Sequence, residues 1–290
     1  KLIRRPEFAS LLGFVAIFAF FLVVAPAFRS FEAFSTTLYA SSTLGIVALA
    51  VGLLMIGGEF DLSSGVAVTT AALAATMLNY NLHLNSWVGA FLALGISLAI
   101  GALNGFLVTR TGIDSFLITL AAFLMLQGLN LAVTKLVTGQ VATPTIADME
   151  GFPSAHAVFA GTFTIGGVTF NVTVLWWILF VAVASYVLFR TKLGNWITAV
   201  GGDQDAARAV GVPVRRVKIL LFMGVGFAAW FVGMHTLFAF DSIQAGQGVG
   251  NEFLYIIAAV IGGCAMTGGR GTAVGTAIGA LIFGMTNQGI

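Results

Sequence analysis

The sequence predicts an all-α, polytopic helical membrane protein. Hydrophobic residues make up 59% of the 290 residues, charged residues make up 8%, and the mean hydropathy is +1.02. Soluble globular domains carry about 25% charged residues, so this chain cannot cover itself with a water-compatible surface. Long apolar runs such as 11–28 and 172–189 favour membrane helices over the short alternating strands of a β-barrel.

Nine apolar segments are candidates for membrane spans, which need about 20 residues each. They cover residues 10–28, 37–57, 62–79, 86–109, 115–137, 172–190, 216–240, 252–266 and 272–290. The first is too long for the apolar part of a signal peptide, so we expect it to be retained. The eighth is short and flanked by glycine, which indicates a partial or broken helix. We expect residues 1–290 to form one transmembrane domain, and the abrupt apolar end predicts a further span in the native chain.

Positive charges orient these spans, because cytoplasmic loops of membrane proteins carry an excess of Lys and Arg. With the N-terminus in the cytoplasm, 11 of the 13 basic residues lie inside and only Arg29 and Lys135 lie outside. The residues placed inside are Lys1, Arg4, Arg5, Arg110, Arg190, Lys192, Arg208, Arg215, Arg216, Lys218 and Arg270. The longest loop, residues 138–171, is then external.

Small residues are expected to matter for packing. The chain has 36 glycines, and Gly101 and Gly105 form a GxxxG pattern that lets two membrane helices approach closely. The single cysteine, Cys264, is predicted to be a small buried hydrophobe, and no intrachain disulfide is possible.

Residues 193–218 form a polar segment between two long apolar spans, and their basic excess places them in the cytoplasm. Asp203 is suited to cap a short helix, and Asp205 adds negative charge at the positive helix end. Gly211 suits the left-handed residue that ends a helix, and Pro213 follows it. The small, smooth surface expected for this helix comes from Ala206, Ala207, Ala209 and Val210. The alternative is an ordinary solvated connector. A connector would not require a helix cap, a helix terminator and an alanine face in combination.

The segment 57–65, GGEFDLSSG, places two carboxylates and two leading glycines between apolar spans at the cytoplasmic end. Asp61 is suited to cap a helix that begins at Leu62. One interpretation is a capped tight turn. The other is a broken-helix element near a translocation path, where irregular backbone survives because it lines a cavity or is buried in protein.

The segment 262–271 is also rich in glycine, but it lacks the GxxxxGK[ST] phosphate-binding pattern, and no nucleotide-binding motif occurs elsewhere. If ATP drives this protein, another subunit must hydrolyse it. We therefore expect no cofactor in this chain.

Polar residues inside membrane spans are candidates for a solute pathway. The pathway candidates are Asp61, which lies just before the third span, and the span residues Asn104, Gln127, Asn130 and Thr134. The last three follow the spacing i, i+3, i+7 and share one helix face. Neutral amides and hydroxyls suit an uncharged polyhydroxy solute, whereas hydrogen bonding between helices is the alternative role. The three histidines have no metal-ligand spacing, and no catalytic constellation lies at either interface.

Four segments in a fixed order resemble the permease subunits of bacterial ABC importers for ribose, xylose and related sugars. They are GGEFDLSSG (57–65), NGFLVTR (104–110), GNWITAVGGDQDAARAVGV (194–212) and the stretch 256–290. The resemblance extends over most of the chain from about Ser42 onward, and the combination of motifs is specific.

The resemblance implies a ten-span permease of the bacterial inner membrane that works as a homodimer, with its last span absent from the present sequence. It implies an extracytoplasmic sugar-binding protein and a cytoplasmic ATPase, usually of two fused cassettes, that binds ATP and Mg²⁺. Residues 193–215 correspond to the family's coupling region. The implied ATPase-coupling residues are Gly201, Gly202, Asp203, Asp205, Ala206, Ala207, Arg208 and Gly211. Membrane lipid is the remaining expected partner, and nucleic acid is not expected.

The chain departs from many relatives at two places. Asp114 and Ser115 stand where two prolines are common, and Gln127 stands where arginine is common, whereas Asp61 is kept. These departures affect the expected identity of the solute more than they affect the assignment of the chain as a transporter. A branched-chain amino-acid permease of the same superfamily is the near alternative. An ion-coupled secondary transporter is less favoured, because such proteins usually carry ionisable residues near mid-membrane, and the spans offer none there.

Overall fold

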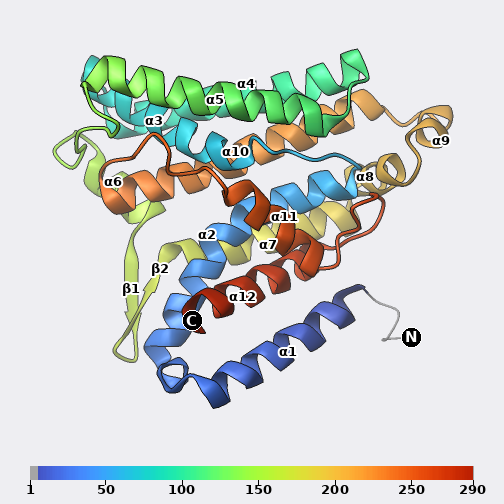
Figure 1. Ribbon diagram of the computed structural model, residues 1–290, viewed down its shortest axis with the longest axis horizontal. Coiled ribbons are helices and arrows are strands. Elements are labelled where there is room, and N and C mark those ends of the chain that lie inside the picture. Colours follow the sequence, from blue (N-terminus) through green and yellow to red (C-terminus); the bar gives the residue numbers. More distant parts are fainter. Residues whose placement is uncertain (1–5, 290) are drawn as a thin grey trace. The chain divides into compact units, whose positions relative to one another are not determined.

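The computed structural model describes residues 6–289, and most of them are helical (Figure 1). These residues form twelve α-helices, a short 3₁₀ turn and one β-hairpin. The helices are α1 (Pro6–Val24), α2 (Phe31–Ile56), α3 (Ser64–Leu82), α4 (Ser86–Thr111), α5 (Ser115–Thr138), α6 (Phe152–Phe159), α7 (Val172–Arg190), α8 (Lys192–Gly202), α9 (Gln204–Ala209), α10 (Val214–Phe240), α11 (Asn251–Ile261) and α12 (Ala273–Gly289). The 3₁₀ turn is η2 (Pro26–Arg29), and the strands are β1 (Thr162–Ile165) and β2 (Val168–Asn171). The all-α, polytopic prediction is confirmed.

Each of the nine predicted spans coincides with a helix. In chain order these helices are α1, α2, α3, α4, α5, α7, α10, α11 and α12. Among the described helices, five are long and apolar enough to cross a membrane, namely α2, α4, α5, α7 and α10. The eighth span, α11, has only 11 residues, in line with its expected shortness. Lys1, Arg4, Arg5 and Ile290, which enter the predictions above, lie outside the described residues.

The region 138–171 was predicted as a loop but contains α6 and the β-hairpin. β1 and β2 pair antiparallel, with Ile165 opposite Val168. Gly166 and Gly167 connect them with positive φ angles of 58° and 85°, which the tight two-residue hairpin turn requires. Two adjacent glycines between short runs of aromatic and β-branched residues were the available sequence signal.

The chain groups into two compact units, each built from separate stretches of sequence. Unit 1 comprises the described residues of Lys1–Glu59, Thr162–Val217 and Leu254–Ile290. Unit 2 comprises Phe60–Gly161 and Lys218–Phe253. Most of α10 therefore belongs to unit 2, and most of α11 belongs to unit 1.

In unit 1, α2 packs against α7 and α12 through small residues. The indole of Trp177 fills the space that a side chain at Gly45 would need. Gly52 similarly admits the Thr276 side chain of α12, because a Cβ at this glycine would lie 2.8 Å from the Thr276 hydroxyl. These glycines let the helices of unit 1 approach closely.

In unit 2, α3 packs against α4 and α5, and α4 also contacts the backbone of α10. A Cβ on Gly101 would overlap the carbonyl of Phe222, and a Cβ on Gly105 would lie 2.8 Å from the Ile219 Cα. The GxxxG pattern is thus confirmed as a close helix contact. The indole N–H of Trp230 donates to the Ala90 carbonyl at 2.8 Å and joins the same two helices.

Candidate functional site

The segment between α7 and α10 folds as two consecutive helices in unit 1, α8 and α9 (Figure 1). The hydroxyl of Thr191 accepts a hydrogen bond from Gly194 N at 3.3 Å and caps α8. Gly194, Ile197 and Val200 form a buried stripe at helical spacing, while the other face of α8 is more exposed. The sequence prediction contained α9 but not α8.

The local geometry expected for α9 is confirmed. One carboxylate oxygen of Asp203 accepts hydrogen bonds from Asp205 N at 3.0 Å and Ala206 N at 2.9 Å. Arg208 and Asp205 form an exposed ion pair at 3.0 Å. Gly211 has a φ of 85° after the helix ends, so it supplies the left-handed terminator. The result is a short helix with a capped, acidic N-terminus.

The surface of α9 differs in one respect from the prediction. Ala206, Ala209 and Val210 are exposed, and Val210 is 80% exposed, but Ala207 is only 3% exposed. The smooth face available to another protein is therefore smaller than the sequence implied, because Ala207 packs inward. A large side chain at position 207 would disturb the fold rather than report on a partner.

The end of α8 meets two other chain segments of unit 1 in what we call the glycine junction, formed by Ile56, Gly58, Gly201, Gly268 and Gly269. A Cβ on Gly201 would overlap the Ile56 carbonyl, and a Cβ on Gly268 would lie 2.9 Å from the Gly58 Cα. Gly269 N donates to the Ile56 carbonyl at 2.8 Å. Backbone therefore touches backbone where α8, the end of α2 and the loop before α12 meet.

The segment 262–271 thus has a structural role in the glycine junction. Gly263, Gly268, Gly269 and Gly271 all have positive φ angles, so the segment folds as a tight series of turns. Cys264 is buried and lies 3.3 Å from the Thr276 hydroxyl, which confirms its prediction as a buried residue. The signal for this turn was visible in the sequence, but its partners at Ile56 and Gly201 were not.

A second group of candidates meets in unit 2 around Asp61. The Asp61 side chain is 3% exposed, and one of its oxygens accepts from Ser63 N at 2.8 Å and Ser63 Oγ at 2.6 Å. Asn104 Nδ2 donates to Ser63 Oγ at 3.0 Å. The structure therefore joins Asp61 to Asn104 through Ser63, a residue that the sequence prediction had not selected.

Asp61 does not cap a helix at Leu62 as predicted. α3 begins at Ser64, and the carboxylate holds the turn before it. Burial raises the pKa of the Asp61 carboxyl to about 6, and the hydrogen bonds from Ser63 oppose that rise. A buried carboxyl with such a pKa is divided between its charged and neutral forms near pH 6.

Two hydroxyls of α5 hold the same loop. Ser115 Oγ accepts from Phe60 N at 3.0 Å, and Thr119 Oγ1 accepts from Leu62 N at 3.0 Å. The Ser115 hydroxyl satisfies a backbone donor that would otherwise need another partner. The loop around Asp61 is therefore held at three places by side chains of α5 and by its own serine.

The three polar candidates on α5 do not share one environment. Asn130 and Thr134 are buried, whereas Gln127 is half-buried. Thr70 of α3 donates to Asn130 Oδ1 at 3.0 Å, and Thr134 donates to the Asn130 carbonyl at 2.6 Å. The bond from Thr70 favours a helix-packing role for Asn130, and the hydroxyl of the buried Thr134 is satisfied within α5, so Gln127 is the most exposed of the three toward a solute.

Among residues 6–289, no group of three or more His, Cys, Asp or Glu side chains is arranged to hold a metal ion. His235 lies buried with Nδ1 at 2.8 Å from the Phe159 carbonyl. The candidate residues described above thus lie at helix ends and in buried polar contacts.

Comparisons with known proteins agree with this architecture. A family model described as "Branched-chain amino acid transport system / permease component" matches residues 33–290. The chain is 32% identical to a ribose import permease of Escherichia coli strain K12 over 287 residues, which are 98% of this chain and 85% of that protein. It is 30% identical to a ribose import permease of Haemophilus influenzae over 292 residues, which are 100% of this chain and 85% of that protein.

A fructose import permease of Rhizobium meliloti is 29% identical over 280 residues, which are 95% of this chain and 75% of that protein. No solved structure is significantly similar to the chain. The family model covers most of the chain, and the apolar helices are those of a multi-pass membrane protein. The chain therefore belongs to the branched-chain amino acid transport system permease family.

Proposed function

We propose that this chain is the membrane subunit of an ATP-driven importer for a monosaccharide or polyol. The observation that carries the proposal is the exposed, capped helix α9 on a segment whose base is locked at the glycine junction. Three relatives named as ribose or fructose import permeases support the solute class. ATP and Mg²⁺ would be bound by a separate cytoplasmic ATPase, since this chain has no phosphate-binding motif.

In this proposal α9 is the contact point for the ATPase. Its N-terminus presents Asp203 and Asp205, and its exposed side presents Ala206, Ala209 and Val210. Small side chains let a partner surface approach the helix backbone, and the acidic end suits a partner with positive charge nearby. The helix is capped at both ends, so a push on it moves the helix as a unit rather than unwinding it.

The glycine junction is the proposed route by which that movement reaches the membrane helices of unit 1. Backbone contacts between Gly201, Ile56 and Gly268 leave no flexible side chain to absorb a displacement. Closely packed elements shift between discrete arrangements rather than deforming gradually. Movement of α8 would therefore be passed to the end of α2 and to the turn before α12.

The proposed solute path is lined by neutral polar groups and does not bind the solute tightly. Gln127 is the candidate whose side chain is most exposed for this role, and Asp61 and Asn104, which are buried and joined through Ser63, are kept from the sequence prediction. Specificity would reside in an external binding protein, and two copies of the chain would enclose the path. We place the protein in the bacterial inner membrane with its N-terminus in the cytoplasm, because that orientation keeps 11 of 13 basic residues inside.

An amino-acid importer is the second candidate, because the family description itself names branched-chain amino acids. A carboxylate and an ammonium group need charged or dipolar partners in a path. The predicted spans offer few such groups, which favours a sugar.

The test is uptake into proteoliposomes that contain the chain together with the ATPase and binding protein encoded beside its gene. We expect ATP-dependent uptake of labelled ribose or fructose and none of leucine. Uptake of leucine but not of the sugars would show that the substrate is an amino acid, and the assignment as an ATP-driven importer would stand.

The role of α9 is tested in the same vesicles with two substitutions at one exposed position. Ala206→Arg should abolish ATPase binding and uptake, whereas Ala206→Ser should retain both. Full activity of Ala206→Arg would overturn the role of α9.

A further inference from the structure

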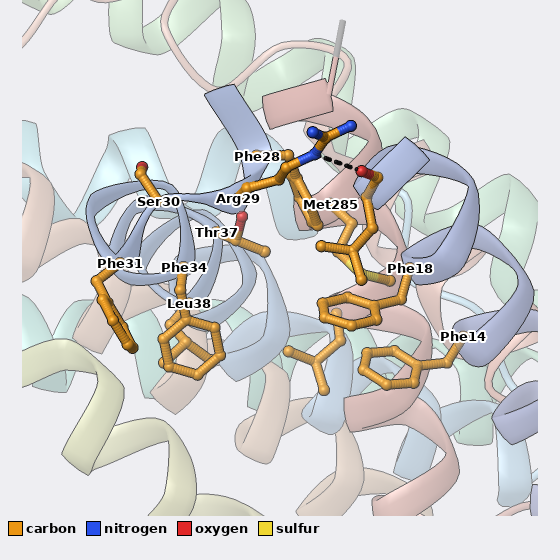
Figure 2. Close-up of a pocket in the computed structure, with 12 residues that line it drawn as sticks. Phe14, Phe18, Phe28, Arg29, Ser30, Phe31, Phe34, Thr37, Leu38 and Met285 are labelled. Carbon is orange, nitrogen blue, oxygen red and sulfur yellow. Dashed lines mark hydrogen bonds between the residues drawn. The ribbon is translucent and has the colours of Figure 1, made fainter. Parts of the chain in front are cut away.

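A cavity of about 290 Å³ opens among α1, η2, α2 and α12 of unit 1 (Figure 2). Its walls are mostly aromatic and aliphatic. Figure 2 shows Phe14 and Phe18 of α1 across from Phe34 and Leu38 of α2, with Met285 of α12 beside Phe18. An apolar hollow of this size on helices of a membrane protein is a place for hydrocarbon.

Arg29 adds a positive charge to the lining of this cavity. Its Nε donates to the Leu22 carbonyl at 2.7 Å, and its Nη2 donates to the Val23 carbonyl at 3.0 Å. A guanidinium has five N–H donors, so these two bonds hold the group in place and leave donors for an anion. Within residues 6–289, no carboxylate lies at ion-pairing distance from Arg29.

Thr37 adds an unsatisfied hydroxyl to the same lining. Its Oγ1 is buried, and it has no hydrogen-bond partner among the described residues, whereas Thr36, Ser41 and Thr43 of the same helix bond to backbone carbonyls. Thr37 as a whole is only 5% exposed. Leaving a buried polar group unpaired costs about 1–3 kcal/mol, so an acceptor on a ligand that displaces the lining enough to reach this oxygen would be stabilising.

From these three features together we propose that the cavity is a specific phospholipid site. One acyl chain occupies the aromatic cavity, the phosphate contacts the Arg29 guanidinium, and an ester carbonyl accepts from the Thr37 hydroxyl. The combination of a fixed cation, a buried donor and an apolar cavity matches one phospholipid molecule. A second copy of the chain would have to bring both an anion and an acceptor into an otherwise hydrophobic hollow.

The bound lipid would join α1 to α2 and α12 of unit 1. A ligand that binds only the folded protein raises stability according to its concentration relative to its dissociation constant, and the membrane supplies phospholipid in excess. The site is thus expected to be occupied in the membrane and to survive mild detergent extraction.

The first experiment measures lipid retention by native mass spectrometry and thermal unfolding of the protein purified in detergent. Added phosphatidylglycerol should raise the melting temperature and add one bound lipid per chain. Diacylglycerol with the same acyl chains lacks the phosphate and should do neither. Equal effects of the two lipids would overturn the assigned role of Arg29 and with it the proposal.

Variants separate the lipid site from general protein stability. Arg29→Gln keeps hydrogen-bond donors but loses the charge, and we expect about tenfold weaker phosphatidylglycerol binding, because charge-assisted hydrogen bonds are about twice as strong as neutral ones. Thr37→Val removes the hydroxyl at nearly constant volume and should weaken binding without lowering the melting temperature of the lipid-free protein. Unchanged binding in both variants would contradict the proposal.

A cavity-filling pair of variants keeps the test valid if Arg29→Gln folds poorly. Leu38→Trp places a large side chain into the cavity and should abolish lipid retention, whereas Leu12→Trp adds the same side chain at a position that is 56% exposed and lies outside the cavity lining. Leu12→Trp should bind lipid normally. If Leu38→Trp instead splits a dimer into single chains with lipid binding unchanged, the cavity is a contact between copies and the proposal is wrong.

Discussion

The Cα of Gly201 faces the carbonyl oxygen of Ile56 so closely that no side chain fits between them. The contact brings the end of α8 onto the end of α2, two positions separated by half of the chain. Gly202, the next residue, faces open space. These neighbouring glycines therefore have different roles, and the difference can be measured.

Gly201→Ala should destabilise the protein by about 1–3 kcal/mol, because the added methyl group must displace backbone rather than a side chain. Uptake should fall further than the amount of folded protein, since the proposed coupling route passes through this contact. Gly202→Ala is the matched control and should keep both stability and uptake. Melting temperature in detergent and uptake per folded transporter are the measurements, and equal behaviour of the two variants would contradict the glycine junction.

The chain between α7 and α10 illustrates how far local sequence reasoning reaches. α9 was predictable because Asp203, Gly211 and Pro213 act on their own neighbours along the chain. α8 was not, because Gly194, Gly201 and Gly202 are poor helix formers and the helix depends on burying Ile197 and Val200. Packing in the folded protein outweighed the low helix propensity of these glycines. The contact of Gly201 with Ile56 joins residues about 145 positions apart, so local sequence could not predict it.

Gly101 of α4 provides a test of packing within unit 2. A methyl group at Gly101 would overlap the Phe222 carbonyl, whereas Gly95 on the same helix faces open space. Gly101→Ala should lower the free energy of unfolding by about 1–3 kcal/mol, and Gly95→Ala should be neutral or slightly stabilising. Thermal unfolding of the two variants in one detergent checks this. A neutral Gly101→Ala would show that α4 and α10 separate more easily than their close contact implies.

Asn130 and Gln127 allow helix packing to be separated from solute contact. Asn130→Ala removes the hydrogen bond from the Thr70 hydroxyl, which keeps a second acceptor at the Val66 carbonyl, and it should reduce the free energy of unfolding by about 0.5–1.5 kcal/mol. Gln127→Ala should alter the concentration dependence of uptake while stability stays within about 0.5 kcal/mol. Thermal unfolding and uptake at several sugar concentrations distinguish the two. A kinetic effect of Asn130→Ala without loss of stability would reverse the roles assigned here.

The polar candidates show a limit of prediction from spacing alone. Gln127, Asn130 and Thr134 follow one helix face, and the spacing made them a single candidate group. The structure divides the group because Asn130 bonds to Thr70 of α3 and Thr134 is buried, while Gln127 is only half-buried. Ser63 was missed for the opposite reason. Its importance comes from lying between Asp61 and Asn104, and these residues become neighbours only after α3 and α4 pack together.

Asp61 should make stability depend on pH. Burial raises the pKa of its carboxyl in the folded protein to about 6 from an ordinary value of 3.8, so the folded state binds a proton more tightly than the unfolded state. The stabilisation from this proton is fully present below about pH 4 and is lost as the pH rises through about 6. Lower pH within this window should therefore raise the contribution of Asp61 to stability.

Asp61→Asn isolates this effect, because its amide oxygen can still accept from Ser63 but carries no charge. The variant should be more stable than the native protein at pH 7.5, by at most about 3 kcal/mol given about 1.4 kcal/mol per pKa unit. The difference in melting temperature should shrink as the pH falls toward 4. A difference that does not change between pH 4 and 7.5 would show that Asp61 keeps an ordinary pKa.

Asp203 offers the most direct measurement on α9, because its charge can be removed either together with the capping oxygen or without it. Asp203→Ala removes the acceptor for Asp205 N and Ala206 N, and loss of such a cap costs about 1 kcal/mol. Because α9 is a short exposed helix, this cost should appear as local unfolding rather than as a lower melting temperature of the whole protein. Asp203→Asn preserves the acceptor and serves as the control.

Hydrogen exchange resolved to α9 should show roughly fivefold faster exchange in Asp203→Ala, as about 1 kcal/mol implies. Exchange in Asp203→Asn should stay close to that of the native protein. If coupling requires an ordered α9, uptake should fall in Asp203→Ala and persist in Asp203→Asn. A loss of uptake in both variants, with α9 protected in Asp203→Asn, would instead assign the carboxylate a direct charge contact with the ATPase. Normal uptake in Asp203→Ala despite faster exchange would remove the need for an ordered helix at this position.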